Sequence, residues 1–312
     1  MMTKTTKFMM GGVAAAALLV ASAAYAQGDQ VEFGPETYDI SVDEFHVDHF
    51  IGTVEVIVEN RNTIQISATG DTEHMDRLDV DTSGETVTVS YEREDFRWND
   101  WSTWVSWWGN NHVDIEDYPT VTVRVPENTH VDVNRMTGSF NAGDLNAPFN
   151  LDGVGALDAV VGNVTEANID IAGAAEIELG DVAGHLAIEI SGAGDVTAGN
   201  SESADIEIHG ASEIFLGDVN GDLDISVAGV GDVRADSVNG DVDIALAGAG
   251  EIRIEDGRAT SFDVSIAGAG DVRFNGVAVD PEISVAGAGN VYIQEYEGRL
   301  DHSGMGSVQV GS

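Results

Sequence analysis

The chain has no cysteine, few basic residues and only 5 prolines. Without cysteine no disulfide can crosslink the fold, so its stability must come from packing and backbone hydrogen bonds. Only 13 lysines and arginines stand against 55 aspartates and glutamates, which gives a formal net charge of -42. This charge leaves no positive field for a phosphate backbone and excludes nucleic-acid binding. Because 43% of the 312 residues are hydrophobic, the chain can still bury a large core, which excludes a disordered acidic tail.

Long apolar runs are also missing, except at the N-terminus. Lys4 and Lys7 precede the run GGVAAAALLVASAA, which ends in the A-x-A pattern of a signal-peptidase site at Ala24 to Ala26. The run is short and rich in alanine and glycine, which argues against a membrane anchor. We therefore expect residues 1–26 to be a signal peptide cleaved after Ala26. We expect no transmembrane segment after cleavage and a location in the periplasm or outside the cell.

The C-terminal half of the chain is a repeat. A G-x-[GAS]-x motif recurs at intervals of 18 to 20 residues, at Gly173, Gly192, Gly210, Gly229, Gly248, Gly268 and Gly287. Apolar residues stand two and four positions before each glycine and four and six positions after it, with polar or small residues between them. That period of two predicts a strand on each side of the motif, and the constant spacing predicts a solenoid.

The repeated motif also predicts the local geometry of each coil. We expect its first glycine to adopt a positive φ and to allow close approach of the backbone of the neighbouring coil. A further polar corner supplies a third inward position, at Val182, Val219, Val238 and Val277.

These patterns predict an all-β fold with two regions after the signal peptide. Residues 151–312 are expected to form a parallel β-solenoid with coils of about 19 residues. Residues 27–150 hold less regular strand-like runs, and we expect them to begin the solenoid and cap its end.

The repeated G-[AS]-G-[DE] turns, after a signal peptide and a divergent N-terminal β segment, resemble the bacterial head GIN domain family of auto-transporter adhesins. The resemblance covers about residues 40–298. It implies a right-handed β-helix similar to pectin-lyase-like folds, without a recognised catalytic set and with an adhesive role. The chain departs from a true auto-transporter in one respect, because no C-terminal run of amphipathic strands or coiled-coil stalk is present to form an anchor.

All five tryptophans fall within residues 96–108, and they are Trp98, Trp101, Trp104, Trp107 and Trp108. One interpretation is an aromatic platform that contacts sugar rings, a lipid interface or a protein partner. The other is that the indoles fold back and cap the open end of the solenoid. The negative charge of the protein disfavours insertion into anionic membranes.

Five positions before the turn glycine, acidic residues recur as Asp205, Asp224, Asp243, Asp263 and Glu282. We expect them to point outward and to stack in one column, where unit charges about 5 Å apart repel by roughly 0.8 kcal/mol in water. The four aspartates are a candidate Ca²⁺ site, since carboxylate oxygens are ligands that Ca²⁺ prefers. The interpretation that we favour is a solvated face that keeps the protein soluble and its edges unpaired.

A second acidic column is expected three positions after the turn glycine, at Glu176, Asp195, Glu213, Asp232, Glu251 and Asp271. Arg234, Arg253 and Arg273 stand two residues further along the same strand face. This arrangement predicts an interleaved ladder of arginines and carboxylates.

Sequence signals for catalysis are weak. His46 and His49 have a metal-like spacing, but positions i and i+3 of a strand point to opposite faces, so we expect no shared ligand role. His185 and His209 are isolated and are expected on the surface. The chain has no P-loop, no nucleophile elbow and no cysteine nucleophile.

The prediction is therefore an exported, non-enzymatic, adhesion-like β-solenoid that contacts a polysaccharide or protein of the bacterial envelope or surface. It has no catalytic residues and no cofactor, with calcium left open. The alternative is a polysaccharide lyase or hydrolase of the β-helix type, which would need a non-repeating cluster of acid and base.

Overall fold

The structure is a computed structural model that describes residues 30–38, 44–84, 86–91, 115–153 and 155–311. The expected signal peptide and the five tryptophans lie outside these ranges. The chain divides into two compact units, one up to Asn141 and one from Ala142 onward. The second unit thus begins ahead of the boundary expected at residue 150. Within the described ranges, no helix is long and apolar enough to cross a membrane.

The first unit is an irregular β region whose strands pair in both directions. Its elements are β1 (Gln30–Tyr38), β2 (Glu44–Asp48), β3 (Ile51–Glu59), β4 (Ile64–Asp71), α1 (Thr72–Met75), β5 (Leu78–Ser83), β6 (Thr86–Tyr91), η1 (Ile115–Asp117), β7 (Thr120–Pro126), β8 (His130–Asn134) and β9 (Thr137–Ala142). β2 lies between β6 and β8 and is parallel to both, while β3 runs parallel to β7. β4 pairs antiparallel with β1 and with β7. The order of these strands in space is therefore not their order in the chain.

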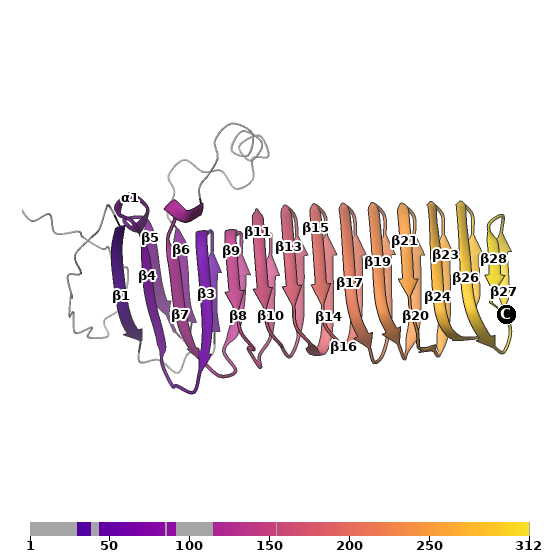
Figure 1. The fold of residues 1–312 in the computed structure, drawn as a ribbon, viewed down its shortest axis with the longest axis horizontal. Coiled ribbons are helices and arrows are strands. Elements are labelled where there is room, and N and C mark those ends of the chain that lie inside the picture. The colour runs from indigo at the N-terminus through magenta and orange to yellow at the C-terminus, as the bar shows by residue number, and fades with distance from the viewer. Residues whose placement is uncertain (1–29, 39–43, 85, 92–114, 154, 312) are drawn as a thin grey trace, which may run out of the picture. The chain divides into compact units, whose positions relative to one another are not determined.

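The second unit is the predicted parallel β-solenoid. It contains β10 (Phe149–Asp152), β11 (Ala156–Val161), β12 (Ala167–Ile171), β13 (Ala174–Leu179), β14 (Val182–Ile190), β15 (Ala193–Ala198), β16 (Ser201–Ile208), β17 (Ala211–Val219), β18 (Leu223–Val227), β19 (Val230–Val238), β20 (Asp241–Leu246), β21 (Ala249–Ile254), β22 (Arg258–Ala259), β23 (Ser261–Ile266), β24 (Ala269–Val279), β25 (Glu282–Val285), β26 (Ala288–Glu297), β27 (Asp301–Gly304) and β28 (Ser307–Val310). The coils of this unit follow one another in chain order (Figure 1).

Apart from the two-residue β22, which pairs with β24, the strands of this unit form two sheets in which each strand pairs in parallel with its equivalent in the next coil. The first sheet runs β10, β12, β14, β16, β18, β20, β23, β25 and β27. The second sheet runs β11, β13, β15, β17, β19, β21, β24, β26 and β28. The all-β solenoid expected from the 19-residue period is thus confirmed.

The core of the solenoid consists of stacked aliphatic columns. Ile206, Ile225 and Ile244 occupy equivalent register positions on β16, β18 and β20 and are at most 2% exposed. The second sheet contributes a similar column that includes Ile214 and Val233. β-Branched side chains fit this pleated surface well, and burying each one contributes about 1.5–3 kcal/mol to stability.

The turn glycines are required by close approach and not by their φ. A Cβ on Gly229 would lie 2.0 Å from the carbonyl oxygen of Gly210, and one on Gly248 would lie 1.9 Å from that of Gly229. None of the first glycines of the seven motifs, from Gly173 to Gly287, has φ in the left-handed region, although Gly250, the third residue of its motif, has φ of 153°. The expected positive φ is therefore wrong, whereas the expected close approach is confirmed.

The third inward position holds in three of the four predicted places. Val182, Val219 and Val238 are at most 2% exposed. Val277 is half-buried, and the neighbouring Ala278 takes the inward place with no exposure. Val277 is displaced from the inward position because the core is packed differently in the preceding coil.

In that earlier coil, Gly257 replaces the inward valine at the position that pairs with Val238. Two large rings, Phe262 and Phe274, stack at 5.2 Å in the same part of the core. The ring of Phe274 lies so close to Gly276 that a Cβ there would be 2.6 Å from it. The rings thus fill volume that valine occupies elsewhere, and the local register shifts.

Candidate binding face

Six acids form an unbroken row along the outer side of the first sheet. Parallel pairing places Asp205 opposite Asp224, Asp224 opposite Asp243 and Asp243 opposite Asp263. The row continues through Glu282 to Asp301. We call these six residues the acidic ladder. The first five face outward because the residues before and after each of them are buried, and Asp301, on the last coil, is in register with Glu282.

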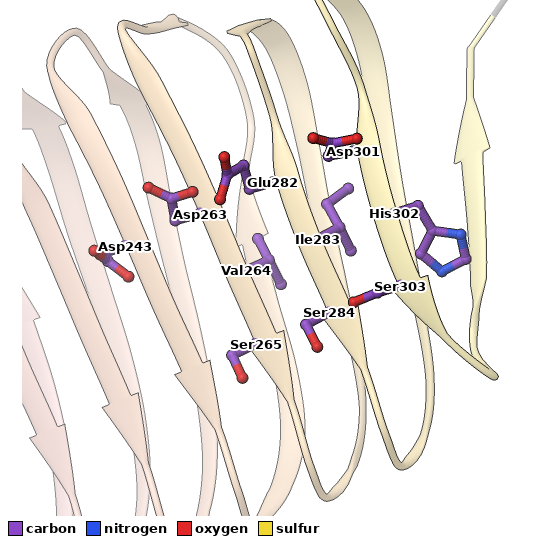
Figure 2. Close-up of a pocket in the computed structure, with 10 residues that line it drawn as sticks. All are labelled: Asp243, Asp263, Val264, Ser265, Glu282, Ile283, Ser284, Asp301, His302 and Ser303. Atoms are coloured by element: carbon purple, nitrogen blue, oxygen red, sulfur yellow. The ribbon is translucent and has the colours of Figure 1, made fainter.

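A row of small residues, four serines and one alanine, runs beside the acidic ladder, two positions along each strand, and we call it the serine row. It consists of Ser226, Ala245, Ser265, Ser284 and Ser303. Because these side chains are short, the surface is hollowed next to the longer carboxylates, with a volume of ≈ 470 Å³ toward the last coil. Figure 2 shows the carboxylates of Asp243, Asp263, Glu282 and Asp301 in succession, with the serines alongside and His302 at the last coil. The face therefore offers anionic and hydroxyl groups at the spacing of the strands.

The ladder carboxylates repel one another at Asp224. Partial burial raises the pKa of this carboxyl above its usual value, and the carboxylates of Asp205 and Asp243 raise it further, with Asp222. Asp205 at the start of the row lies near a basic group, since His185 Nε2 is 3.4 Å from its Oδ2. The electrostatics favour a proton or another cation on this face.

Toward the start of the solenoid the acids shift by two residues along the strand. Asp152, Asp170, Glu189 and Glu207 lie in register in this second row, which we call the upstream row. The pKa of Asp170 is raised by burial and by Glu189 and Asp152. A second hollow of ≈ 300 Å³ lies where the upstream row overlaps the acidic ladder, and its lining includes Glu189, Asp205 and Glu207.

The predicted ladder of arginines and carboxylates on the second sheet is wrong in two of its three rungs. Arg253 does pair with Glu251, as expected. Arg234 instead binds Glu255, with 2.5 Å between Nη2 and Oε1. The guanidinium of Arg273 lies over the ring of Tyr292, 4.4 Å from its centroid.

The missing rungs have a simple cause. Asp232 Oδ1 accepts a hydrogen bond of 2.8 Å from the backbone N–H of Glu251 in the next coil. Asp271 Oδ1 likewise accepts the backbone N–H of Asn290 at 3.1 Å. The short aspartate side chains thus accept hydrogen bonds from the backbone. Arg234 and Arg273 instead contact the longer side chain of Glu255 and the aromatic ring of Tyr292.

His46 and His49 have separate partners, and His49 lies just after the end of β2, with a positive φ of 52°, and not within the strand. His46 Nε2 lies 2.9 Å from Asp132 Oδ2, and His130 Nε2 lies 3.2 Å from the other oxygen of that carboxylate. His49 Nδ1 lies 2.9 Å from Asp48 Oδ1.

One cluster on the solenoid was missed by the sequence analysis. Glu189, Glu207 and His209 bring two carboxylates and an imidazole together, with one ligand atom from each lying within 4.8 Å of the others. The alignment on the turn glycine contained the signal, because both glutamates stand three positions before a turn glycine and His209 stands one before. The five tryptophans lie outside the described residues, and their role stays a prediction.

A family model described as "Putative auto-transporter adhesin, head GIN domain" matches residues 49–236 and 199–299. The chain belongs to this family. Together with the β-solenoid, membership of the head GIN domain family supports an adhesion-like protein and suggests an extracellular or envelope location.

Several solved structures are similar to this head GIN domain protein. A putative adhesin from Bacteroides fragilis shares 12% identity at a TM-score of 0.38, over 91% of this chain and 98% of that one. A putative adhesin from Parabacteroides merdae shares 13% identity at a TM-score of 0.38, over 92% and 98%. A putative lipid binding protein from Parabacteroides distasonis shares 16% identity at a TM-score of 0.34, over 92% and 98%. Among curated proteins no sequence match is found.

Proposed function

We propose that this protein is exported, is not an enzyme, and holds a polysaccharide or protein of the bacterial envelope or surface on the acidic ladder and its serine row. The observation that carries the proposal is the register of these two rows over successive coils. Repeated carboxylates and hydroxyls suit a partner that is itself extended and carries amino or hydroxyl groups. The tryptophan segment, residues 96–108, is proposed as a second contact.

The lack of enzymatic activity is supported by the same repetition. A catalytic site needs one acid and one base held in a unique arrangement, whereas the ladder places equivalent carboxylates on each coil from Asp205 to Asp301. Calcium is proposed as an accessory ligand of Asp205, Asp224, Asp243 and Asp263, because neighbouring carboxylates in register supply oxygen ligands and the repulsion between them would fall on binding.

The test is co-sedimentation with peptidoglycan, outer-membrane and exopolysaccharide fractions. A ladder variant, Asp243→Asn, Asp263→Asn, Glu282→Gln and Asp301→Asn, removes four charges from the face. The matched control, Asp158→Asn, Glu176→Gln, Asp195→Asn and Glu213→Gln, removes four charges that lie in register on the second sheet. We expect wild type and control to pellet with one fraction and the ladder variant to stay in the supernatant.

Two further arms separate the remaining alternatives. A variant that lacks residues 96–108 tests the tryptophan segment, and loss of pelleting in this variant alone would move the binding site from the ladder to that segment. Soluble sugar released by the wild-type protein would contradict the proposal and favour the lyase or hydrolase. The observation that favours this alternative is the cluster at His209. It does not repeat from coil to coil, as a catalytic site would not.

A further inference from the structure

The cluster of Glu189, Glu207 and His209 lies on two neighbouring strands of the first sheet. β14 carries Glu189 and β16 carries Glu207, and parallel pairing places these two residues in register. His209 follows directly after β16, on the same outward side as Glu207 because the buried Ile208 separates them. His209 Nε2 lies 2.9 Å from Glu207 Oε1. We propose that these three side chains bind one divalent transition-metal ion, with Zn²⁺ as the ion to test.

The geometry needs little adjustment to hold such an ion. One ligand atom from each residue already lies within 4.8 Å of the others. Around a tetrahedral Zn²⁺ with bonds of about 2.0–2.2 Å, ligand atoms are roughly 3.3–3.6 Å apart. All three side chains are exposed and two of them are long, so small rotations about their χ angles bring them to that spacing. Glu189 and Glu207 also line the hollow of ≈ 300 Å³ that adjoins the cluster, although His209 does not.

The donor set selects the class of metal. An imidazole nitrogen with two carboxylates suits Zn²⁺ and its first-row neighbours, whereas Ca²⁺ prefers an all-oxygen shell. Three protein ligands leave a coordination position open for water or for a group on a partner molecule. The site is thus distinct from the all-carboxylate ladder proposed for calcium.

Charge around the cluster favours a cation. The carboxylates of Glu189 and Glu207 stand in register and repel each other, and Asp170 precedes Glu189 in the same row. Asp205 and Asp224 line the adjoining hollow. Besides His209 itself, the imidazole of His185 lies near these acids, with Nε2 3.4 Å from Asp205 Oδ2. A dication would neutralise the two ligand carboxylates and relieve their repulsion.

The repeat indicates that His209 is not needed for the turn. The equivalent position of the other coils holds a small residue, as Ala172, Ser191, Ala228, Ala247, Ala267 and Ala286. A turn built from alanine in five of these coils gains nothing structural from an exposed imidazole. The substitution His209→Ala therefore restores the residue of the sibling coils and should leave the fold intact.

The experiment is isothermal titration of the metal-free protein with ZnCl₂, with circular dichroism of each variant as the folding check. We expect the wild type to bind one equivalent of Zn²⁺ more than His209→Ala and than Glu189→Gln, with at least a tenfold loss of affinity at this site in each variant. The matched control is His302→Ala, which removes an exposed histidine from the same sheet and should leave the stoichiometry unchanged. Bound Co²⁺ should give a visible absorption spectrum that His209→Ala lowers and His302→Ala does not.

Identical Zn²⁺ stoichiometry and affinity in the wild type and His209→Ala would overturn the proposal. Equal losses in His209→Ala and His302→Ala would also overturn it, since they would indicate diffuse attraction to an acidic surface. Retention of the binding by Glu189→Gln with its loss in His209→Ala would contradict the role given to Glu189. These outcomes are independent of the co-sedimentation test, because metal binding is measured without any partner.

Discussion

Side chains that connect one coil of the solenoid to the next alternate between acid and amide. Asp144 Oδ1 accepts the backbone N–H of Asn163, and Asn163 Oδ1 accepts that of Asp181, both at 2.8 Å. The stack continues from Asp181 to Asn200 at 2.8 Å and from Asn200 to Asp218 at 2.9 Å. Because an amide separates each pair of carboxylates, no two like charges are adjacent among these five residues. The alternation satisfies backbone donors at the corners without charge repulsion.

The substitution Asn200→Asp tests this alternation. It keeps the shape and the accepting oxygen but places three carboxylates in succession. We expect it to lower the free energy of unfolding by about 1–2 kcal/mol, because each of two neighbouring carboxylates at about 5 Å adds roughly 0.8 kcal/mol of repulsion. The pKa of the new carboxyl should be raised by its neighbours, so the stability lost at pH 7 should return as the pH falls below about 4. Urea unfolding at pH 7 and at a pH below about 4 measures the change in the free energy of unfolding. Asn239→Asp, exposed and outside the stack, is the control, and an equal loss there would argue against the mechanism.

A second prediction about charge concerns Asp224 of the acidic ladder. Since its folded pKa is raised above the unfolded value of 3.8, the folded state binds the proton more tightly, and this contribution to stability is lost as pH rises through the folded pKa. We expect Asp224→Asn to raise the Tm at pH 7 and to change it little at about pH 3, where the aspartate is already protonated.

Thermal unfolding followed by circular dichroism at the two pH values measures the effect of Asp224→Asn. The exposed Glu202→Gln removes one charge outside the acidic ladder and serves as the control. A Tm gain at pH 7 no larger than that of Glu202→Gln would show that the ladder costs no folding stability.

At the scale of elements, the turn between the two sheets depends on backbone contact between coils. An added methyl group at Gly229 would lie 2.0 Å from the carbonyl oxygen of Gly210. We expect Gly229→Ala to destabilise the protein by about 1–3 kcal/mol, because the coils can separate only by breaking their pairing. Gly143→Ala is the matched control, since nothing lies within 4 Å of a Cβ there. Denaturant midpoints of the two variants should differ clearly, and equal midpoints would mean that the turn relaxes without cost.

The elements also divide into those that local patterns predict and those that they do not. Ile206 and Ile225 repeat at a constant offset from the turn glycine, so their strands and their stacking follow from the period alone. The position of β2 between β6 and β8 has no such signature, because these segments are distant in the chain and share no repeat. The same limit applies to Val277, whose displacement by Ala278 depends on two phenylalanine rings that fill the core nearby.

For the whole molecule, the net charge of -42 is the dominant long-range term. Self-repulsion destabilises a folded chain of this charge, and salt screens it, with a Debye length that falls from about 30 Å at 0.01 M to about 3 Å at 1 M. We expect the Tm to rise with NaCl over this range. The four-charge ladder variant should show a smaller rise, and a Tm that is independent of salt would mean that surface repulsion is already compensated.

The sequence alone determined the solenoid. A 19-residue period with alternating apolar residues places the apolar side chains at the same positions of every coil, and stacking of the coils buries them as β-branched columns. It also determined the acidic ladder, since equal offsets from a repeated turn become equal places on neighbouring strands. Only the tertiary structure decided which groups each side chain contacts. Asp232 caps a backbone N–H, Arg273 lies on Tyr292, and His209 meets glutamates from two coils, because such contacts depend on side-chain reach and on competing partners that a one-dimensional period does not contain.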